Sequence, residues 1–246
     1  MGCGEAGRAA PALPVAVVMF GSPGSGKGTQ SRFLVEWLGI PQISTGDMLR
    51  EHMRQGTEIG RNITGRMKSG SLVSDDLVNE LVRRRISEPD CSAGFILDGY
   101  PRTSEQAVAL LPLLSGIGLI EVVIHLSVDY NIVVSRLTGR RVCPVCGILY
   151  NATSRPPLVE GVCDADGSSL AVRDDDREDV VRRRLDQYEE RTRPLINYFR
   201  DTGARLFEVD ASRDRPEAVF ERIRSAVGCV TQGDEAPRAA SEELIR

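Results

Sequence analysis

The stretch Gly21-Ser-Pro-Gly-Ser-Gly-Lys27-Gly-Thr29 decides the fold of this chain. It follows the apolar run at residues 15–20 and precedes a helical pattern that ends at Gly39. A strand, a glycine loop and a helix form the context of the phosphate-binding motif G-x-x-x-x-G-K-[ST], although Thr29 stands one place later than in the strict form. Backbone N–H groups can close around a phosphate there, the helix N-terminus adds partial positive charge, and Lys27 adds a full one. We therefore predict that this segment binds the phosphates of a nucleotide.

The composition is that of a soluble globular protein, with 41% hydrophobic and 27% charged residues in 246. The formal net charge of −4 argues against a general nucleic-acid-binding surface. No apolar run approaches the roughly 20 residues that span a membrane. A protein that binds polyphosphates must then concentrate its positive charge locally, and the Arg-rich stretches 136–141 and 182–193 are the candidates.

The ends of the chain and its cysteines indicate a cytoplasmic protein. Residues 1–14 are rich in Ala, Gly and Pro and lack the apolar segment of a secretory signal. Residues 229–246 are polar and are expected to fray. Six cysteines in a chain of this length do not indicate a disulfide scaffold. We expect both ends to be flexible.

Short apolar runs alternate with helical patterns along the chain. Extended segments are predicted at residues 15–20, 41–44, 94–98, 121–126 and 206–209. This alternation predicts an α/β fold, with a parallel sheet covered by helices on both faces. In such sheets the ligand binds beyond the carboxyl ends of the strands, where Lys27, Asp98 and the neighbourhood of Arg50 and Arg102 are expected.

Two helical regions carry more specific expectations. Residues 46–86 should form several short helices broken by Gly56, Gly60 and Gly70, with Ser74 or Asp75 capping the last of them. Residues 178–200 should form one long amphipathic helix.

Residues 140–177 differ from the rest and read as a small inserted domain. Cys143-Pro-Val-Cys146 and Cys163-Asp-Ala-Asp166 are spaced like the two halves of a zinc ribbon, with Asp166 as the fourth ligand. A segment of under about 40 residues cannot bury enough apolar surface to hold its shape alone. A structural Zn²⁺ is therefore predicted; a disulfide or a metal-free domain held by polar contacts are the alternatives. Cys3, Cys91 and Cys229 are expected to be free.

Three separate segments resemble the signatures of the adenylate kinases. They are residues 21–30, 42–50 and 98–103, and the resemblance extends over residues 15–227. It implies a P-loop NTPase-type five-stranded parallel sheet with helices on both faces. It also implies a core at 15–43, 74–138 and 177–228, an AMP-binding insertion at 44–73 and a zinc-binding lid at 139–176, since some bacterial members carry Zn²⁺ on a similar Cys₃Asp set. The implied reaction is reversible transfer of the terminal phosphoryl group from MgATP to AMP, giving two ADP.

The resemblance also implies roles for individual residues. ATP-side positions are Gly24, Ser25, Gly26, Lys27, Gly28, Thr29, Arg136, Arg140, Leu149, Tyr150 and Arg213. AMP-side positions are Thr45, Arg50, Ser71, Leu72, Val73, Gly99, Arg102, Gln106, Arg173 and Arg184. Catalytic positions are Lys27, Asp98, Arg102, Arg136, Arg140, Arg173 and Arg184, with Asp98 orienting the water shell of Mg²⁺.

These residue types suit phosphoryl transfer, which needs alignment and charge neutralisation more than covalent help. Arginine grips phosphate oxygens bidentately and keeps its proton, and no histidine base is required. Simpler interpretations exist, because an arginine on a helix is usually solvated and Asp98 could cap a turn. Asp175 and Asp176 could be salt-bridge or hinge residues.

Two other functions remain open at this point. One is a related kinase that uses GTP as donor or UMP or CMP as acceptor. Thr45 and Gln106 favour adenine by resemblance. The other, from a different class, is a nucleotide-binding sensor without turnover. A monomer that binds ATP, AMP and ADP, and neither nucleic acid nor membrane, is expected.

Overall fold

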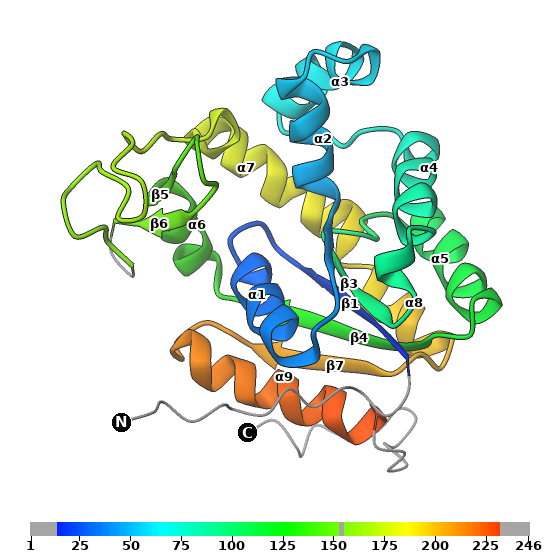
Figure 1. The fold of residues 1–246 in the computed structure, drawn as a ribbon. Helices are drawn as coiled ribbons and strands as arrows, with labels where there is room; N and C mark the ends of the chain where they lie inside the picture. The colour runs from blue at the N-terminus through cyan, green and yellow to red at the C-terminus, as the bar shows by residue number, and fades with distance from the viewer. Residues whose placement is uncertain (1–13, 153–154, 232–246) are drawn as a thin grey trace.

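Five parallel strands form the centre of the structure, a computed structural model that describes residues 14–152 and 155–231 (Figure 1). The strands are β1 (Val15–Gly21), β2 (Gln42–Ser44), β3 (Gly94–Asp98), β4 (Ile120–Ser127) and β7 (Leu206–Asp210). Their order across the sheet is β2-β3-β1-β4-β7, and every neighbouring pair is parallel. The predicted extended segments and the predicted sheet class are confirmed.

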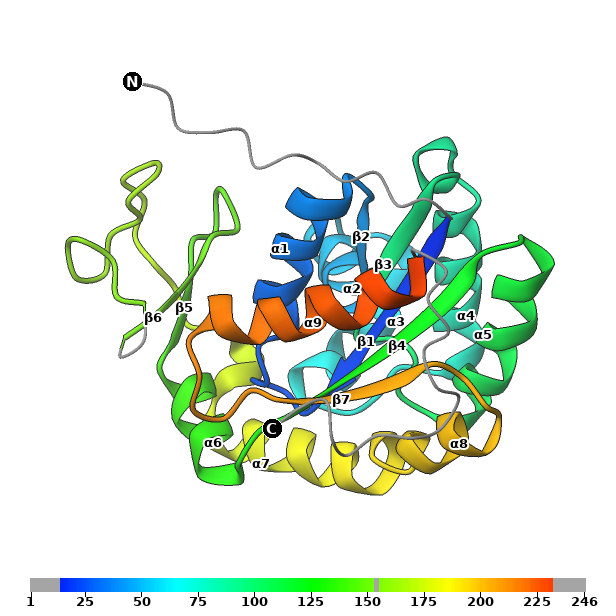
Figure 2. The ribbon, with the colours of Figure 1, turned by 90° about the horizontal axis from the view of Figure 1, so that it is seen from below.

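Helices cover both faces of this sheet, because side chains on a strand point alternately to opposite sides. On β1, Val15, Val17 and Met19 belong to the apolar cluster that includes α1 (Lys27–Leu38) and α9 (Pro216–Thr231). The alternate side chains of β1 join the cluster on the other face, with α4 (Asp75–Ile86), α5 (Ser104–Gly116) and α8 (Leu195–Asp201). Figure 2 shows α1 and α9 together on the near face of the sheet.

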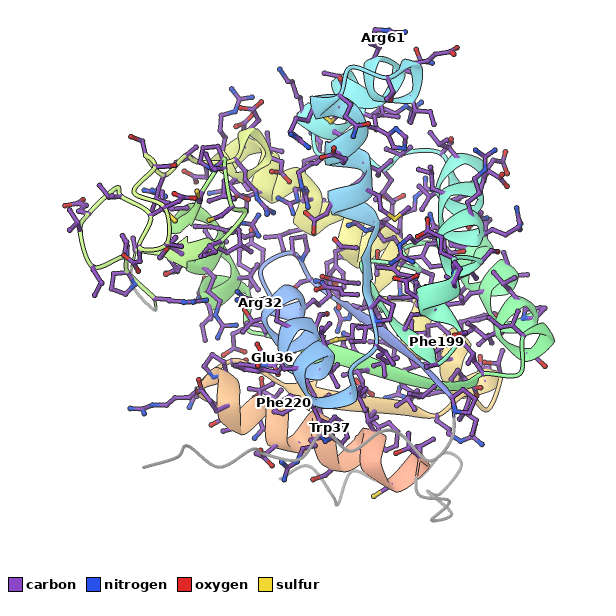
Figure 3. The ribbon with its side chains drawn as sticks, viewed as in Figure 1. Arg32, Glu36, Trp37, Arg61, Phe199 and Phe220 are labelled. Atoms are coloured by element: carbon purple, nitrogen blue, oxygen red, sulfur yellow. The ribbon has the colours of Figure 1, made fainter. Side chains whose placement is uncertain are left out.

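The contact between α1 and α9 is partly aromatic. Trp37 lies edge-on to Phe220 (Figure 3), with ring centroids 6.2 Å apart. Phe33 packs against the same ring of Phe220. Trp37 is half-buried and serves to pack these two helices, as expected of a core residue.

Residues 45–68 form two helices that stand away from the sheet, α2 (Thr45–Arg54) and α3 (Glu58–Lys68) (Figure 1). The prediction that Gly60 breaks a helix is wrong, because it lies inside α3. A Cβ atom there would lie 2.0 Å from the carbonyl oxygen of His52 in α2. Gly60 therefore permits the close crossing of α2 and α3.

The expected cap of α4 is also different in the structure. Ser74 occupies the N-cap position without a side-chain cap hydrogen bond. Asp75 instead accepts hydrogen bonds from Thr103 Oγ1, at 3.0 Å, and Gln106 Nε2, at 2.6 Å. The carboxylate connects the start of α4 to the start of α5.

Residues 139–176 form a separate small unit that follows α6 (Tyr130–Thr138). It contains the antiparallel pair β5 (Arg140–Val142) and β6 (Leu149–Asn151), and it ends in a 3₁₀ turn at Asp174–Asp176. Its own cluster of buried side chains consists of Cys143, Tyr150 and Cys163. A second 3₁₀ turn, Pro89–Cys91, precedes β3.

The predicted single helix over residues 178–200 is interrupted. Helix α7 (Glu178–Gln187) passes into a π-helical turn (Tyr188–Thr192), and α8 begins at Leu195. Pro194 has no N–H group to continue the hydrogen-bond ladder. The turn also directs Thr192 Oγ1 to the carbonyl oxygen of Arg102, at 2.8 Å. Such π turns occur frequently at functional sites.

The last helix extends to Thr231, three residues beyond the predicted boundary at 228. The rest of the expected flexible ends, residues 1–13 and 232–246, lies outside the described residues. None of the helices within residues 14–152 and 155–231 combines the length and apolar composition required to cross a membrane.

Candidate active site

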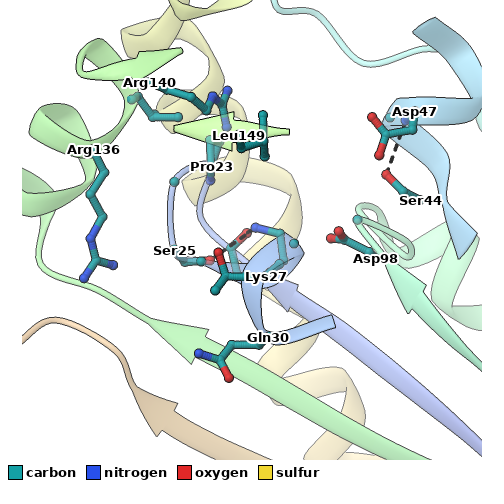
Figure 4. Close-up of a pocket in the computed structure, with 18 of the residues that line it drawn as sticks. Pro23, Ser25, Lys27, Gln30, Ser44, Asp47, Asp98, Arg136, Arg140 and Leu149 are labelled. Atoms are coloured by element: carbon teal, nitrogen blue, oxygen red, sulfur yellow. Dashed lines mark hydrogen bonds between the residues drawn. The ribbon is translucent and has the colours of Figure 1, made fainter. Parts of the chain in front are cut away.

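A cleft of about 1480 Å³ opens beyond the carboxyl ends of β1 and β3, between residues 139–176 and the α2–α3 unit (Figure 4). Its lining carries eleven basic and five acidic side chains, although the whole chain is net negative. The expected local concentration of positive charge is therefore present. From the two Arg-rich stretches, Arg136, Arg140 and Arg184 line the cleft.

The glycine loop wraps around the amine of Lys27. Lys27 Nζ donates to the carbonyl oxygens of Gly21, at 2.9 Å, and Ser22, at 2.8 Å, and to Ser25 Oγ at 3.2 Å. Gly21 has φ +151°, and a Cβ there would lie 2.4 Å from a carbonyl of β4. Burial lowers the pKa of Lys27 to about 8, and Asp98 opposes that shift. A phosphate in this loop would restore the preference for the charged amine.

Asp98 lies at the end of β3, facing the glycine loop (Figure 4). Burial raises the pKa of Asp98, and the charge on Lys27 opposes this rise. Gln42 Nε2 donates to Asp98 Oδ2 at 2.9 Å. Gln42 was not singled out from the sequence, although it opens the 42–50 segment. Its bond occupies one carboxylate oxygen and fixes the direction of the other.

The opposite wall of the cleft carries Arg50 and Arg102. Arg50 pairs with Asp47 at 2.6 Å. Burial alone would raise the pKa of Asp47, but Arg50, Ser44 and Arg173 together outweigh it and the pKa is lowered. Arg102 Nε donates to the carbonyl oxygen of Gly99 at 2.8 Å. Burial, with the charge of Arg184, lowers the pKa of Arg102 to about 10, so the guanidinium stays charged at neutral pH.

Two aspartates, Asp175 and Asp176, hold arginines at the wall of the cleft formed by residues 139–176 and α7. Arg140 Nε donates to Asp176 Oδ2 at 2.6 Å, and Arg184 Nη1 lies 3.2 Å from Asp176 Oδ1. Arg184 also pairs with Asp175 Oδ2 at 3.0 Å. The side chain of Asp176 is fully buried. The salt-bridge interpretation of Asp175 and Asp176 is thus confirmed: both are counter-ions within the protein.

The side chain of Arg173 has no hydrogen bond or ion pair to residues 14–152 and 155–231. Burial and the charges of Arg50 and Arg140 lower the pKa of Arg173 to about 10. The guanidinium remains charged near two others of the same sign. An anion placed between these three side chains would relieve their repulsion.

Most of the predicted nucleotide-binding residues line this one cleft. They are Gly24, Ser25, Gly26, Lys27, Gly28, Thr29, Arg50, Ser71, Leu72, Asp98, Gly99, Arg102, Arg136, Arg140, Leu149, Tyr150, Arg173, Arg184 and Arg213. Beside α6, Arg136 Nη2 donates to the carbonyl oxygen of Ala211 at 2.8 Å. This bond ties α6 to the turn that carries Arg213.

Three predicted AMP-side residues, Thr45, Val73 and Gln106, are buried behind the cleft wall. Thr45 Oγ1 donates to the carbonyl oxygen of Gly99 at 2.9 Å. Gln106 Oε1 accepts from the Arg102 N–H at 2.8 Å, and its amide nitrogen donates to Asp75. Both ends of the Gln106 side chain therefore bond to protein groups.

Several lining residues were missed from the sequence, among them Arg32, Arg155, Gln187 and Arg215. Arg32 follows the glycine loop closely enough to be suspected. Gln187 is brought to the cleft by packing between segments distant in sequence, for which no local signal exists.

Neither histidine lines the cleft in the described part of the chain. His125 is buried, stacks on Phe20 and bonds to Tyr188 Oη at 2.8 Å, and burial lowers its pKa. His52 Nδ1 lies 3.0 Å from Thr57 Oγ1. A structural role for both agrees with the expectation that no histidine base is needed.

The four predicted metal ligands come together within the 139–176 unit, and one of them, Cys143, also lines the cleft. The ligand atoms of Cys143, Cys146, Cys163 and Asp166 all lie within 4.8 Å of one another. The sulfurs of Cys146 and Cys163 are 3.5 Å apart, and Cys143 Sγ lies 3.2 Å from Asp166 Oδ2. Zinc–sulfur bonds of about 2.3 Å in a tetrahedral site require spacings of this size. The donor set therefore fits a closed, four-coordinate zinc site.

The amino-acid sequence of this chain is similar to those of known proteins. The family model described as adenylate kinase matches residues 19–204. The chain is 47% identical to an adenylate kinase of Thermosipho melanesiensis, over 83% of this chain and 96% of the relative. It is 48% identical to one of Methanococcoides burtonii, over 80% and 91%, and 52% identical to one of Trichlorobacter lovleyi, over 75% and 86%.

Proposed function

The chain belongs to the adenylate kinase family, and we propose that its cleft moves the terminal phosphoryl group of MgATP to AMP, reversibly giving two ADP. Family membership makes the protein a nucleoside monophosphate kinase. One observation carries the assignment of the site: Lys27, Asp98 and arginines from both insertions converge on a single cleft. A site for one nucleotide would not need positive side chains on two opposite walls.

In this proposal, the glycine loop and the α6 side of the cleft bind the donor. The loop at 24–29 holds the β- and γ-phosphates, because its backbone N–H groups and the α1 N-terminus favour negative charge. Arg136, Leu149, Tyr150 and Arg213 lie where the rest of ATP would extend. Tyr150 is buried in the lid cluster, so little of its side chain is open to a ligand.

The acceptor binds between α2 and the start of α5. Arg50 and Arg102 face the phosphate of AMP, and the loop at 71–73 faces the base. Thr45 and Gln106 contribute by holding Gly99 and Arg102 in place, which their hydrogen bonds support. Residues 44–73 then act as the AMP-binding insertion, residues 139–176 as the lid, and 15–43, 74–138 and 177–228 as the core.

Charge neutralisation is the main contribution of the protein to the reaction. Lys27, Arg140, Arg173 and Arg184 surround the space between the two phosphate sites. The arginines now paired with Asp175 and Asp176 would exchange those carboxylates for phosphate oxygens. Each such contact adds to the rate if it is stronger in the transition state than with bound substrates.

Mg²⁺ enters with ATP and neutralises part of the phosphate charge when bound. Asp98 is the residue proposed to orient its water molecules. Burial raises the pKa of Asp98 more than the charge of Lys27 lowers it. A divalent cation nearby would favour the ionised carboxylate. Gln42 holds the carboxylate in a fixed orientation for this purpose.

We further propose that Cys143, Cys146, Cys163 and Asp166 hold a structural Zn²⁺. Four protein ligands leave no open coordination position, so the metal would fold the lid and take no part in the chemistry. The lid cluster contains few buried apolar side chains, which supports a need for the metal. A cytoplasmic monomer is proposed as the working form.

The proposal is tested by measuring ADP formation from pairs of nucleotides. ATP with AMP should be the best pair, ahead of GTP as donor and of UMP or CMP as acceptor. Lys27→Met should bind nucleotides weakly and turn over at least about 100-fold more slowly, as expected when one transition-state contact is lost. Nucleotide binding without ADP formation in the wild-type protein would instead favour the sensor function.

A further inference from the structure

The loop that joins α3 to α4, residues 69–73, is bound both to the end of α3, where Arg66 Nη1 donates to the Leu72 carbonyl oxygen at 3.4 Å, and to α7 of the core. The Leu72 N–H donates to Gln187 Oε1 at 3.1 Å. Arg183 Nη1 donates to the carbonyl oxygen of Ser69 at 2.9 Å. Between them Gly70, at φ +76°, approaches so closely that a Cβ would lie 2.9 Å from a methyl carbon of α7. Residues more than a hundred positions apart are thus joined at both ends of the loop.

The orientation of the Gln187 amide follows from its partner. A backbone N–H can only donate, so the atom that faces Leu72 must be the accepting oxygen. Gln187 is half-buried and lines the cleft, as do Ser71 and Leu72. The side chain therefore stands between the core helix and the loop where the acceptor is proposed to bind.

We infer that Gln187, assisted by Arg183, is a positioning residue for the acceptor nucleotide. Its side-chain oxygen fixes the Leu72 amide, and with it the backbone of residues 70–73, before AMP arrives. This inference rests on the proposed function, in which that backbone faces the base of AMP. A loop that is already ordered loses less conformational entropy on binding, so its ligand binds more tightly.

Helix α7, which contacts the acceptor loop through Gln187, also contacts the end of the lid. Arg184, adjacent to Arg183, pairs with Asp175 and Asp176 at the end of the lid. Two successive residues of α7, Arg183 and Arg184, thus hold the acceptor loop and the lid aspartates. Gln187 should affect the acceptor loop alone, because it contacts Leu72 and not the lid aspartates.

The chain offers a matched control on the same helix. Arg182 is exposed and pairs with Glu178, one helical turn away on α7 itself. Arg182→Leu removes a charge of the same kind as Arg183→Leu without touching the 69–73 loop. Gln187→Leu removes the accepting oxygen at nearly constant volume, and Gln187→Glu retains an accepting oxygen.

The experiment measures kcat and KM for AMP and ATP separately, together with hydrogen exchange of the Leu72 amide in the nucleotide-free protein. Gln187→Leu should raise KM for AMP about 3- to 10-fold, the range for one lost hydrogen bond. KM for ATP should change less than about twofold, and Leu72 should exchange faster by a similar 3- to 10-fold. Arg183→Leu should act in the same direction and Arg182→Leu should not. Gln187→Glu should restore the protection of Leu72.

Other outcomes would overturn the inference. They are an unchanged KM for AMP in Gln187→Leu, equal rises in KM for AMP and ATP, or Leu72 exchange that Gln187→Glu does not restore. Melting temperatures identify a variant that fails to fold, and Arg183→Leu then supplies the test. A wild-type protein that forms no ADP would refute the proposed function instead, so the two failures are distinguishable.

Discussion

Replacing Asp176 by asparagine tests whether Arg140 and Arg184 exchange this carboxylate for phosphate oxygens when nucleotide binds. The Asp176 carboxylate accepts three hydrogen bonds, two from Arg140 and one from Arg184. Oδ1 accepts two of these bonds and Oδ2 one, so asparagine, which keeps the shape and one accepting oxygen, loses at least one charged hydrogen bond, worth about 1.5–3 kcal/mol. The side chains of Arg140 and Arg184 are 16% and 18% exposed, and water can therefore compensate in part.

We expect Asp176→Asn to lower the free energy of unfolding by about 2 kcal/mol, below the 3–5 kcal/mol of a fully buried broken pair. For a chain of this size that corresponds to a fall in Tm of about 4–8 °C. Asp174→Asn is the matched control, because Asp174 is 74% exposed and lies 3.8 Å from Lys68. An exposed pair contributes at most about 1 kcal/mol, so the control should change Tm by no more than about 4 °C.

The informative comparison repeats both melts at saturating ADP, which the enzyme equilibrates with ATP and AMP. Phosphate oxygens should then replace the carboxylate as partners of Arg140 and Arg184. The difference in Tm between the wild type and Asp176→Asn should then become smaller. By linkage, this means that the variant binds nucleotide more tightly than the wild type. A deficit no larger than that of Asp174→Asn, or one that nucleotide leaves unchanged, would refute the reasoning.

Three further predictions concern the glycine loop, the lid and the α2–α3 crossing. Because the pKa of Lys27 is lowered to about 8, kcat/KM for MgATP should fall above that pH. Between about pH 8 and 10.5 the unfolded chain binds the extra proton, so the free energy of unfolding should rise with pH in the wild type and not in Lys27→Met; parallel profiles would contradict this. Chelation, or Cys146→Ser, should remove zinc and lower Tm, whereas Cys229→Ser should do neither; equal zinc content and Tm in Cys146→Ser would exclude the metal site. Gly60→Ala should destabilise the protein, because its Cβ would lie 2.0 Å from a backbone oxygen. Gly65→Ala in the same helix has open space and should be neutral or stabilising. Similar effects of the two variants on Tm would contradict the close crossing of α2 and α3.

The sheet and the glycine loop were predictable because their signals are local. Apolar runs bounded by glycine mark buried strands, and the spacing from Gly21 to Lys27 is itself the phosphate-binding device. The Cys₃Asp cluster was equally visible, since its ligands come in two closely spaced pairs.

Features that depend on distant contacts could not be predicted. Gly60 looked like a helix breaker because the chain alone does not show that α2 crosses it. The π turn after Gln187 carries a hydrogen bond from Thr192 to Arg102, 90 residues away, which no local pattern indicates. The hydrogen bond from Gln106 to Asp75 likewise joins residues 31 positions apart in the chain.

The transfer of a labelled phosphoryl group tests the central claim most directly. Wild-type protein is incubated with MgATP labelled at the γ-phosphate and with unlabelled AMP. The account predicts that the label appears in the β-phosphate of ADP, that it does so only when AMP is present, and that Lys27→Met loses the transfer. Label released as inorganic phosphate, or label that stays in bound ATP, would contradict it.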